Sequence, residues 1–348
     1  MKKILSLAWV CVQSAWLVGQ ASATTVEIIP PAEEKISVVG QGGPEKPYGA
    51  AVTLATSVGI GSFVKVGSLD TTHSLVTQGL SLSPFYNYQI FGRQMRLSLG
   101  WSVDYEFTQP DNPTGRRIDY SDISVGFSFP QIVTIPRVEV SVGSSATLAI
   151  PVSRPSLAAD KYLGANLGAT LSRDFKLLGI GFLYAFGVTK NVHRSKMILV
   201  DPALFQDYPY AWARDTDSLV SGRLPLGDPL TEWALSNQLT LSYAPPAVTW
   251  LSCSLSLGVS NSWKYELYGE RDELTAEVAK TGRGRSDSTN GGFEVSLSPS
   301  KRYAVSLGLI SVQPAKKADN ASFYSPIFNF ASAAANYTRL YLALKGNF

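Results

Sequence analysis

Apolar and polar residues alternate through long stretches of this chain. Between residues 94 and 107, apolar side chains occupy every second position from Met95 to Phe107, and most positions between them are polar. Residues 177–189 alternate between large apolar and small residues, and residues 248–264 between apolar residues and serine. Successive side chains of a strand point to opposite faces, so this period of two predicts β-strands with one apolar face.

Twelve segments carry a strand-like pattern. They span residues 50–66, 75–90, 94–107, 118–129, 137–150, 162–172, 177–189, 233–244, 248–264, 290–298, 302–312 and 337–348. These segments are 9 to 17 residues long, whereas a strand of a globular protein usually has about five or six residues. Their polar face is mostly Ser and Gly with scattered charges, where a soluble sheet would carry more Lys and Glu. Such strands suit a lipid-exposed sheet with a polar inner side.

The connections between these segments alternate in length. Short ones lie at 91–93, 130–136, 173–176, 245–247 and 299–301, and long ones at about 67–74, 108–117, 151–161, 190–232, 265–289 and 313–336. Strict alternation of short turns and long loops is expected of a barrel that crosses a membrane. A β-sandwich has no reason to follow this rule.

The final segment, residues 337–348, shows the same alternation most clearly. Leu340, Leu342, Leu344 and Phe348 fall on one face, while Arg339 and Lys345 fall on the other. The sequence printed here ends on the aromatic residue Phe348.

The first residues have the pattern of a cleaved secretion signal. Lys2 and Lys3 precede an apolar stretch from Ile4 to Val18, and Ala21-Ser22-Ala23 matches a small-residue cleavage site. This start, the alternating strands and the aromatic end together resemble the bacterial outer-membrane β-barrel proteins. The alternative is a secreted, soluble all-β protein that happens to end on Phe.

The resemblance implies an all-β, transmembrane, antiparallel up-and-down barrel of about 12 strands, with short periplasmic turns and long extracellular loops. We expect a signal peptide at 1–23, a periplasmic N-terminal segment at 24–49 and the barrel at 50–348. In this class the barrel-assembly machinery reads the last strand, which here means Leu340, Leu342, Leu344 and Phe348. Outer-membrane lipid and lipopolysaccharide are the implied surroundings, and the bacterial outer membrane is the implied location.

Composition agrees with a membrane protein that lacks membrane helices. Charged residues make up 16% of the chain, against roughly 25% in soluble domains. No apolar run after the predicted signal peptide reaches the ~18 residues that a membrane helix needs. The formal net charge is +3, which gives no indication of nucleic acid as a partner.

Known chemical motifs are missing from the sequence. No metal-binding spacing is found, and no cofactor is predicted. The chain has two histidines, His73 and His193, and His193 shares a long predicted loop with several aspartates. A hydrolase at the barrel rim would need a nucleophile within reach of its base, but no such motif is recognisable, so we predict no catalytic residues.

Inward-facing positions are the best candidates for function. Lys65, Gln78 and Asn166 are expected on this wall, and the predicted lumen-lining charged and amide residues are Arg96, Asp104, Glu106, Glu139, Gln238, Glu294, Arg339 and Lys345. A twelve-stranded barrel lies between the size that side chains fill and the size that leaves a water channel. The small residues on the wall favour an open interior, and therefore a porin-like passive channel for small hydrophilic solutes.

Two features leave alternatives open. The loop 190–232 contains four aromatic residues and four prolines. It would either constrict a pore or face outward and bind a partner or host molecule. In the second case the barrel is a non-conducting anchor. Aromatic residues near strand ends, including Trp233, Trp250 and Trp263, would either form girdles at the lipid–water interface or reflect ordinary strand composition.

Overall fold

The computed structural model describes residues 47–59, 76–90, 92–107, 118–175, 177–200, 224–267, 282–300, 302–316 and 338–348. Its elements are β1 (Tyr48–Gly59), β2 (Val76–Ile90), β3 (Arg93–Glu106), β4 (Ile118–Tyr120), β5 (Ile123–Ile135), β6 (Val140–Ile150), α1 (Arg154–Ala158), β7 (Lys161–Phe175), β8 (Ile180–His193), β9 (Met197–Val200), β10 (Leu224–Pro229), β11 (Thr231–Tyr243), β12 (Leu251–Leu267), β13 (Gly282–Leu297), β14 (Tyr303–Pro314) and β15 (Thr338–Asn347).

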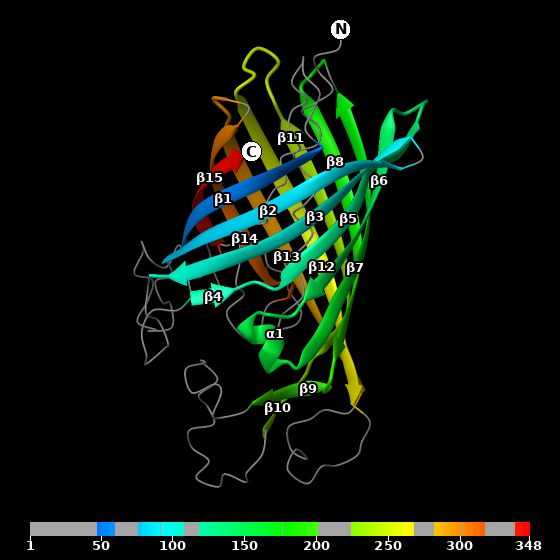
Figure 1. The fold of residues 1–348 in the computed structure, drawn as a ribbon, viewed down its shortest axis with the longest axis vertical. Helices are drawn as coiled ribbons and strands as arrows, with labels where there is room; N and C mark the ends of the chain where they lie inside the picture. Colours follow the sequence, from blue (N-terminus) through cyan, green and yellow to red (C-terminus); the bar gives the residue numbers. More distant parts are fainter. Residues whose placement is uncertain are drawn as a thin grey trace.

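Twelve of these strands close into one antiparallel barrel (Figure 1). The ring runs β1, β2, β3, β5, β6, β7, β8, β11, β12, β13, β14 and β15, and β15 pairs back to β1 through nine registered residue pairs. The short strand β4 adds to β3, and β9 and β10 pair with each other outside the ring. The predicted fold class and the predicted number of strands are confirmed.

The structure corrects several predicted boundaries. The segment predicted as one strand at 118–129 is interrupted at Ser121 and Asp122, which separate β4 from β5. After this break, β5 continues to Ile135, beyond the predicted end of that strand, and β13 begins at Gly282 rather than at residue 290. Among the described residues, no helix is long and apolar enough to cross a membrane.

Large apolar side chains cover the outside of the barrel. Leu80 and Leu82 of β2 are 47% and 41% exposed, and Leu342 and Leu344 of β15 are 48% and 50% exposed. Residues between them, such as Ser81 and Ala343, are buried. A soluble protein would bury its leucines, so this reversed pattern suits a barrel whose outer face lies in lipid.

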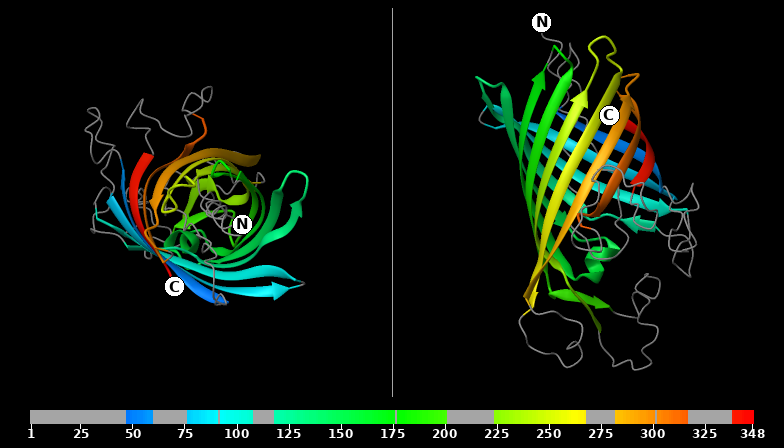
Figure 2. Two further views of the ribbon diagram at one scale, coloured as in Figure 1. Left: turned by 90° about the horizontal axis from the view of Figure 1, so that it is seen from above. Right: turned by 180° about the vertical axis from the view of Figure 1, so that it is seen from behind.

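Connections at the two ends of the barrel differ as predicted. Short turns join β2 to β3, β5 to β6, β7 to β8, β11 to β12 and β13 to β14, and the C-terminus lies at that same end of the barrel (Figure 1). The opposite end carries α1 between β6 and β7, and β9 and β10 between β8 and β11 (Figures 1 and 2). We call these the short-turn end and the long-loop end.

Outward-facing aromatic residues bracket an apolar band. At the long-loop end, Trp233 of β11 lies opposite Trp263 of β12, with Lys190 of β8 and Arg285 of β13 beside them in register. Tyr243 ends β11 at the short-turn end, ten residues after Trp233. Ten steps of about 3.4 Å along a strand tilted by about 40° correspond to a height of about 26 Å, close to the ~25 Å band of membrane barrels.

Candidate functional site

Small and polar side chains line the inside of the barrel. Among the described residues, buried polar side chains outnumber buried hydrophobic ones, and most of the buried hydrophobic residues are alanines. Members of the polar set on the strands of the ring include Ser57, Ser81, Arg96, Ser102, Thr147, Asn166, Gln238, Thr240, Ser260, Glu294, Ser296, Ser306 and Lys345. The inner wall therefore offers hydrogen-bonding groups where a soluble barrel would have an apolar core.

The best-connected inner cluster lies on β13, β14 and β15. Glu294 accepts a hydrogen bond of 2.6 Å from the Tyr341 hydroxyl, and the Lys345 ammonium lies 3.2 Å from each carboxylate oxygen. Both charged side chains are only 7% exposed. Ser296 and Ser306 share a hydrogen bond of 2.8 Å next to this cluster. A buried ion pair of this kind needs its extra hydrogen bonds, because desolvation of each ion costs several kcal/mol.

A second inner cluster lies near the short-turn end, on β2 and β3. Arg96 is 5% exposed. Its Nε donates a hydrogen bond of 2.9 Å to Asn87, and its guanidinium carbon lies 4.3 Å from the centre of the Phe85 ring. These contacts hold the cation against the wall on neighbouring strands.

Acidic residues gather farther along the same wall. Asp104 of β3 is the register partner of Asp119 of β4, and Arg339 of β15 lies within electrostatic range of Asp104. Glu106 is half-buried at the end of β3, opposite Thr77, whose hydroxyl contacts that of inward-facing Ser57 at 2.6 Å. Two acidic side chains thus adjoin on this part of the wall, and the Arg339 cation acts on one of them.

Two sequence-based placements are wrong. Glu139 is exposed in the turn before β6 and has a positive φ of 51°, because the strand starts at Val140 rather than at residue 137. Gln78 lies between two inward-facing neighbours and shares the outer face with Leu80. Side chains alternate between the two faces of a strand whatever their polarity, so this position points outward. Lys65 and His73 lie outside the described residues, as does the part of the loop 190–232 between residues 201 and 223.

His193 ends β8 in a polar cluster at the long-loop end. Its ring lies edge-on to Tyr265, with centroids 5.7 Å apart. The Tyr265 hydroxyl donates to the Asn191 carbonyl at 2.8 Å and accepts from the His193 backbone N–H at 3.3 Å. These contacts give His193 a structural setting at the end of β8. No described group of three or more His, Cys, Asp or Glu is arranged to hold a metal ion.

The last strand closes the ring. Leu340, Leu342 and Leu344 face outward and are exposed, and Phe348 is 65% exposed. The backbone of Phe348 exchanges two hydrogen bonds of 3.0 Å with Ala50 at the start of β1. Its ring lies edge-on to that of Tyr303, 6.3 Å away. The residues predicted as an assembly signal therefore lie on the lipid-facing side of the closing seam.

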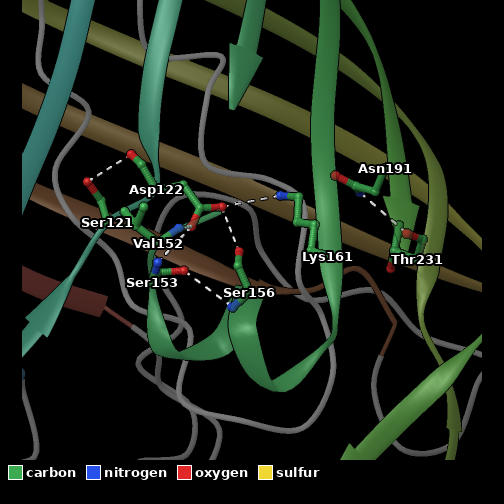
Figure 3. Close-up of polar contacts among 8 residues, drawn as sticks. All are labelled: Ser121, Asp122, Val152, Ser153, Ser156, Lys161, Asn191 and Thr231. Carbon is green, nitrogen blue, oxygen red and sulfur yellow. Dashed lines mark hydrogen bonds and ion pairs between the residues drawn. The ribbon is translucent and has the colours of Figure 1, made fainter. Parts of the chain in front are cut away.

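Sequence reasoning missed a buried carboxylate at the long-loop end (Figure 3). One oxygen of Asp122 accepts hydrogen bonds from the backbone N–H groups of Val152 and Ser153, at 3.2 and 3.0 Å. The other oxygen accepts from the Ser156 hydroxyl at 2.6 Å and lies 3.4 Å from the Lys161 ammonium. Its only sequence signal was an acid inside an otherwise regular strand pattern. The four donors lie about 30 to 39 residues later, three in the connection between β6 and β7 and the fourth, Lys161, at the start of β7.

Burial alone would raise the pKa of Asp122. Hydrogen bonds from Ser153 and Ser156, together with the Lys161 ammonium, outweigh this effect and hold the pKa below its ordinary value. The carboxylate is therefore ionised at neutral pH.

Comparisons with solved structures place this arrangement among known barrels. An outer-membrane channel from Pseudomonas putida F1 is similar over 87% of this chain and 96% of its own, with a TM-score of 0.50 and 12% identity. The β-domain of a Bordetella autotransporter covers 86% of this chain and 99% of its own, with a TM-score of 0.40 and 9% identity. An anion-selective porin from Comamonas acidovorans covers 86% and 98%, with a TM-score of 0.31 and 11% identity.

No protein-family model matches the sequence, and no curated protein sequence matches it. The likeness is therefore one of fold, and it agrees with the closed ring of twelve strands, the apolar outer face and the polar inner wall. The chain has the fold of the bacterial outer-membrane β-barrels.

Proposed function

We propose that this protein is a porin-like passive channel of the bacterial outer membrane that admits small hydrophilic solutes. The observation that carries the proposal is the inner wall of serine, threonine, amide and charged side chains, with glycines between them. A wall of this kind favours water and polar solutes over packed side chains. The solved channel from Pseudomonas putida, with the same fold, adds support by analogy.

In this proposal residues 1–23 direct export and are removed, residues 24–49 remain on the periplasmic side, and residues 50–348 form the barrel. The short-turn end is periplasmic, and the long-loop end faces the outside of the cell. Leu340, Leu342, Leu344 and Phe348 engage the barrel-assembly machinery, and the outer face contacts lipid and, in the outer leaflet, lipopolysaccharide. No catalytic step is assigned to the barrel.

Charge placement supports a transverse field along the proposed path. Lys345 lies against the carboxylate of Glu294, whereas Arg96 is held by an amide and an aromatic ring. Asp104 and Asp119 lie together on β3 and β4. We propose that Arg96, Asp104, Glu106, Gln238, Glu294, Arg339 and Lys345 line the lumen, and that the placement of their charges along it sets ion preference.

Single-channel recording in planar bilayers tests the proposal. The purified, folded protein is expected to give discrete conductance steps, and heat-unfolded protein is expected to give none. Folded protein that produces no steps in any condition, including after replacement of the connection 151–160 by a short flexible turn, would contradict the channel.

Two neighbouring cysteine variants provide a sharper version. Ser145 and Ala146 of β6 face opposite sides: Ser145 lies beside inward-facing Gly168, and Ala146 is the register partner of Leu167, which is 66% exposed. In a background with Cys11 and Cys253 replaced by serine, a charged thiol reagent should reduce the current of Ser145→Cys and leave that of Ala146→Cys unchanged. Equal effects on the two variants would show that the current does not pass through the barrel.

A further inference from the structure

The third long connection, between β6 and β7, is folded back over the barrel opening instead of extending away from it. Its helix α1 lies at the long-loop end and within the outline of the ring in both views (Figures 1 and 2). Ser153 caps this helix by accepting a hydrogen bond of 3.3 Å from the Ser156 N–H, and Pro155 occupies the first turn. Both features fix the start of a short helix.

The connection is attached to the wall through Asp122. This residue lies at the break between β4 and β5, where the Ser121 hydroxyl takes the place of a strand partner and accepts from the Ser102 N–H at 2.8 Å. Interruptions of this kind re-aim side chains. Here the break directs the Asp122 carboxylate toward α1, where four donors from the connection and from Lys161 meet it (Figure 3).

The attachment lies on the inner side of the wall. Lys161 at the start of β7 lies over Gly164, where an added Cβ would be 3.2 Å from its ammonium nitrogen. Gly164 pairs with Ala149 and shares the inner face with buried Asn166. The ammonium and carboxylate side chains are only 11% and 16% exposed.

The helix presents different side chains on its two sides. Ser156 is 2% exposed and faces the wall, whereas Leu157 is 57% exposed and Arg154 is exposed. Because the Ser156 hydroxyl bonds the half-buried Asp122 carboxylate, displacement of the helix would break this hydrogen bond and expose both groups. Polar contacts with the wall therefore hold the connection in a defined place.

We propose that α1, pinned by Asp122, is the constriction of this barrel and sets the upper size of the solutes that pass. This inference rests on the proposed channel and assigns its selectivity filter to the connection 151–160. Asp122 acts as a positioning residue, because it touches the constriction and not the solute.

The test compares Asp122→Ala with Asp174→Ala, which makes the same chemical change at the short-turn end of β7, far along the strand from Lys161. A third variant replaces residues 154–158 by glycine and serine, and heat-dependent mobility on a denaturing gel checks that each barrel is folded. Conductance is measured in the presence of neutral polyethylene glycols of graded size, so that charge does not affect the cut-off. Asp122→Ala and the replacement should both increase conductance and admit larger polymers, and Asp174→Ala should keep the wild-type cut-off.

A second readout does not depend on conduction. In the background without Cys11 and Cys253, the thiol of Ser156→Cys should react slowly with a water-soluble maleimide and at least tenfold faster when Asp122→Ala is added. If the folded Asp122→Ala variant and the replacement of residues 154–158 both keep the wild-type conductance and cut-off, α1 is not the constriction, although the protein is still a channel. Faster labelling in barrels that never conduct would overturn the proposed function, and with it the role of α1 in selecting solutes. Slow labelling in both backgrounds would show that Asp122 does not hold the helix.

Discussion

The ion pair between Glu294 and Lys345 allows a quantitative test of how dry the inner wall is. Glu294→Gln keeps the size of the side chain but leaves the Lys345 ammonium, 7% exposed, without its counter-ion. Breaking a buried ion pair by removing one partner costs about 3–5 kcal/mol. The amide can still accept a hydrogen bond from the Tyr341 hydroxyl, so we expect a loss near the lower limit, about 3 kcal/mol.

A double-mutant cycle separates the pair from its surroundings. Lys345→Met should also cost about 3 kcal/mol, because it leaves a buried carboxylate with neutral donors alone. Glu294→Gln combined with Lys345→Met should cost clearly less than the sum of the two, with a coupling energy of up to about 3 kcal/mol. Free energies of unfolding would come from urea titrations in lipid vesicles, followed by tryptophan fluorescence.

The control is Glu139→Gln, the same chemical change at an exposed turn residue. It should change the free energy of unfolding by less than about 0.5 kcal/mol. If Glu294→Gln also costs less than about 0.5 kcal/mol, water surrounds the cluster and the argument from desolvation fails. In that case the charges face the proposed conduction path directly.

Four further outcomes are expected. Gly308→Ala should destabilise by about 1–3 kcal/mol in the same urea assay, because its Cβ would lie 2.5 Å from the Tyr341 ring and hydroxyl; most of this cost should disappear in a Tyr341→Ala background. Arg154→Glu should shift the reversal potential in a salt gradient toward cation selectivity, and no shift would show that the ions do not pass near this exposed residue. The pKa of Asp122 is lowered, so the stability that its carboxylate gives to the folded connection is present above the unfolded pKa and is lost as pH falls through the folded pKa. With Lys161 as the charged group that faces it, conductance should stay constant from pH 7 to pH 5 and rise only under stronger acid. Phe348→Ala should lower the amount of folded protein in the outer membrane, measured by heat-modifiable mobility, and wild-type levels would remove its role in assembly.

Much of the fold could be predicted because its signals are local. Side-chain direction along a strand depends only on the period of two, so Leu97 and Leu99 could be assigned to the outer face before any pairing was known. The alternation of turn lengths then indicated which neighbouring strands form hairpins. The same rule, applied strictly, places Gln78 with Leu80 on the outer face.

The candidate site was less predictable because its contacts join distant strands. Tyr341 and Lys345 reach Glu294 from positions 47 and 51 residues away. Which inward residues meet depends on the stagger of the closed barrel, and alternation alone does not encode it. Arg96 could be assigned to the interior from its position, but its contact with Phe85 required the register between β2 and β3.

The sequence by itself determined that the chain forms twelve long strands with apolar and polar faces, because each hydrophobic period is a property of neighbouring residues. Tertiary structure alone decided that the pattern at 118–129 breaks at Ser121 and Asp122, and that the connection 151–160 folds back to meet this break. The physical reason is that a largely desolvated carboxylate needs hydrogen-bond donors, and only the closed ring brings donors from distant parts of the chain to it. In this barrel a short helix and a lysine contact Asp122, and no local pattern in the sequence predicts these contacts.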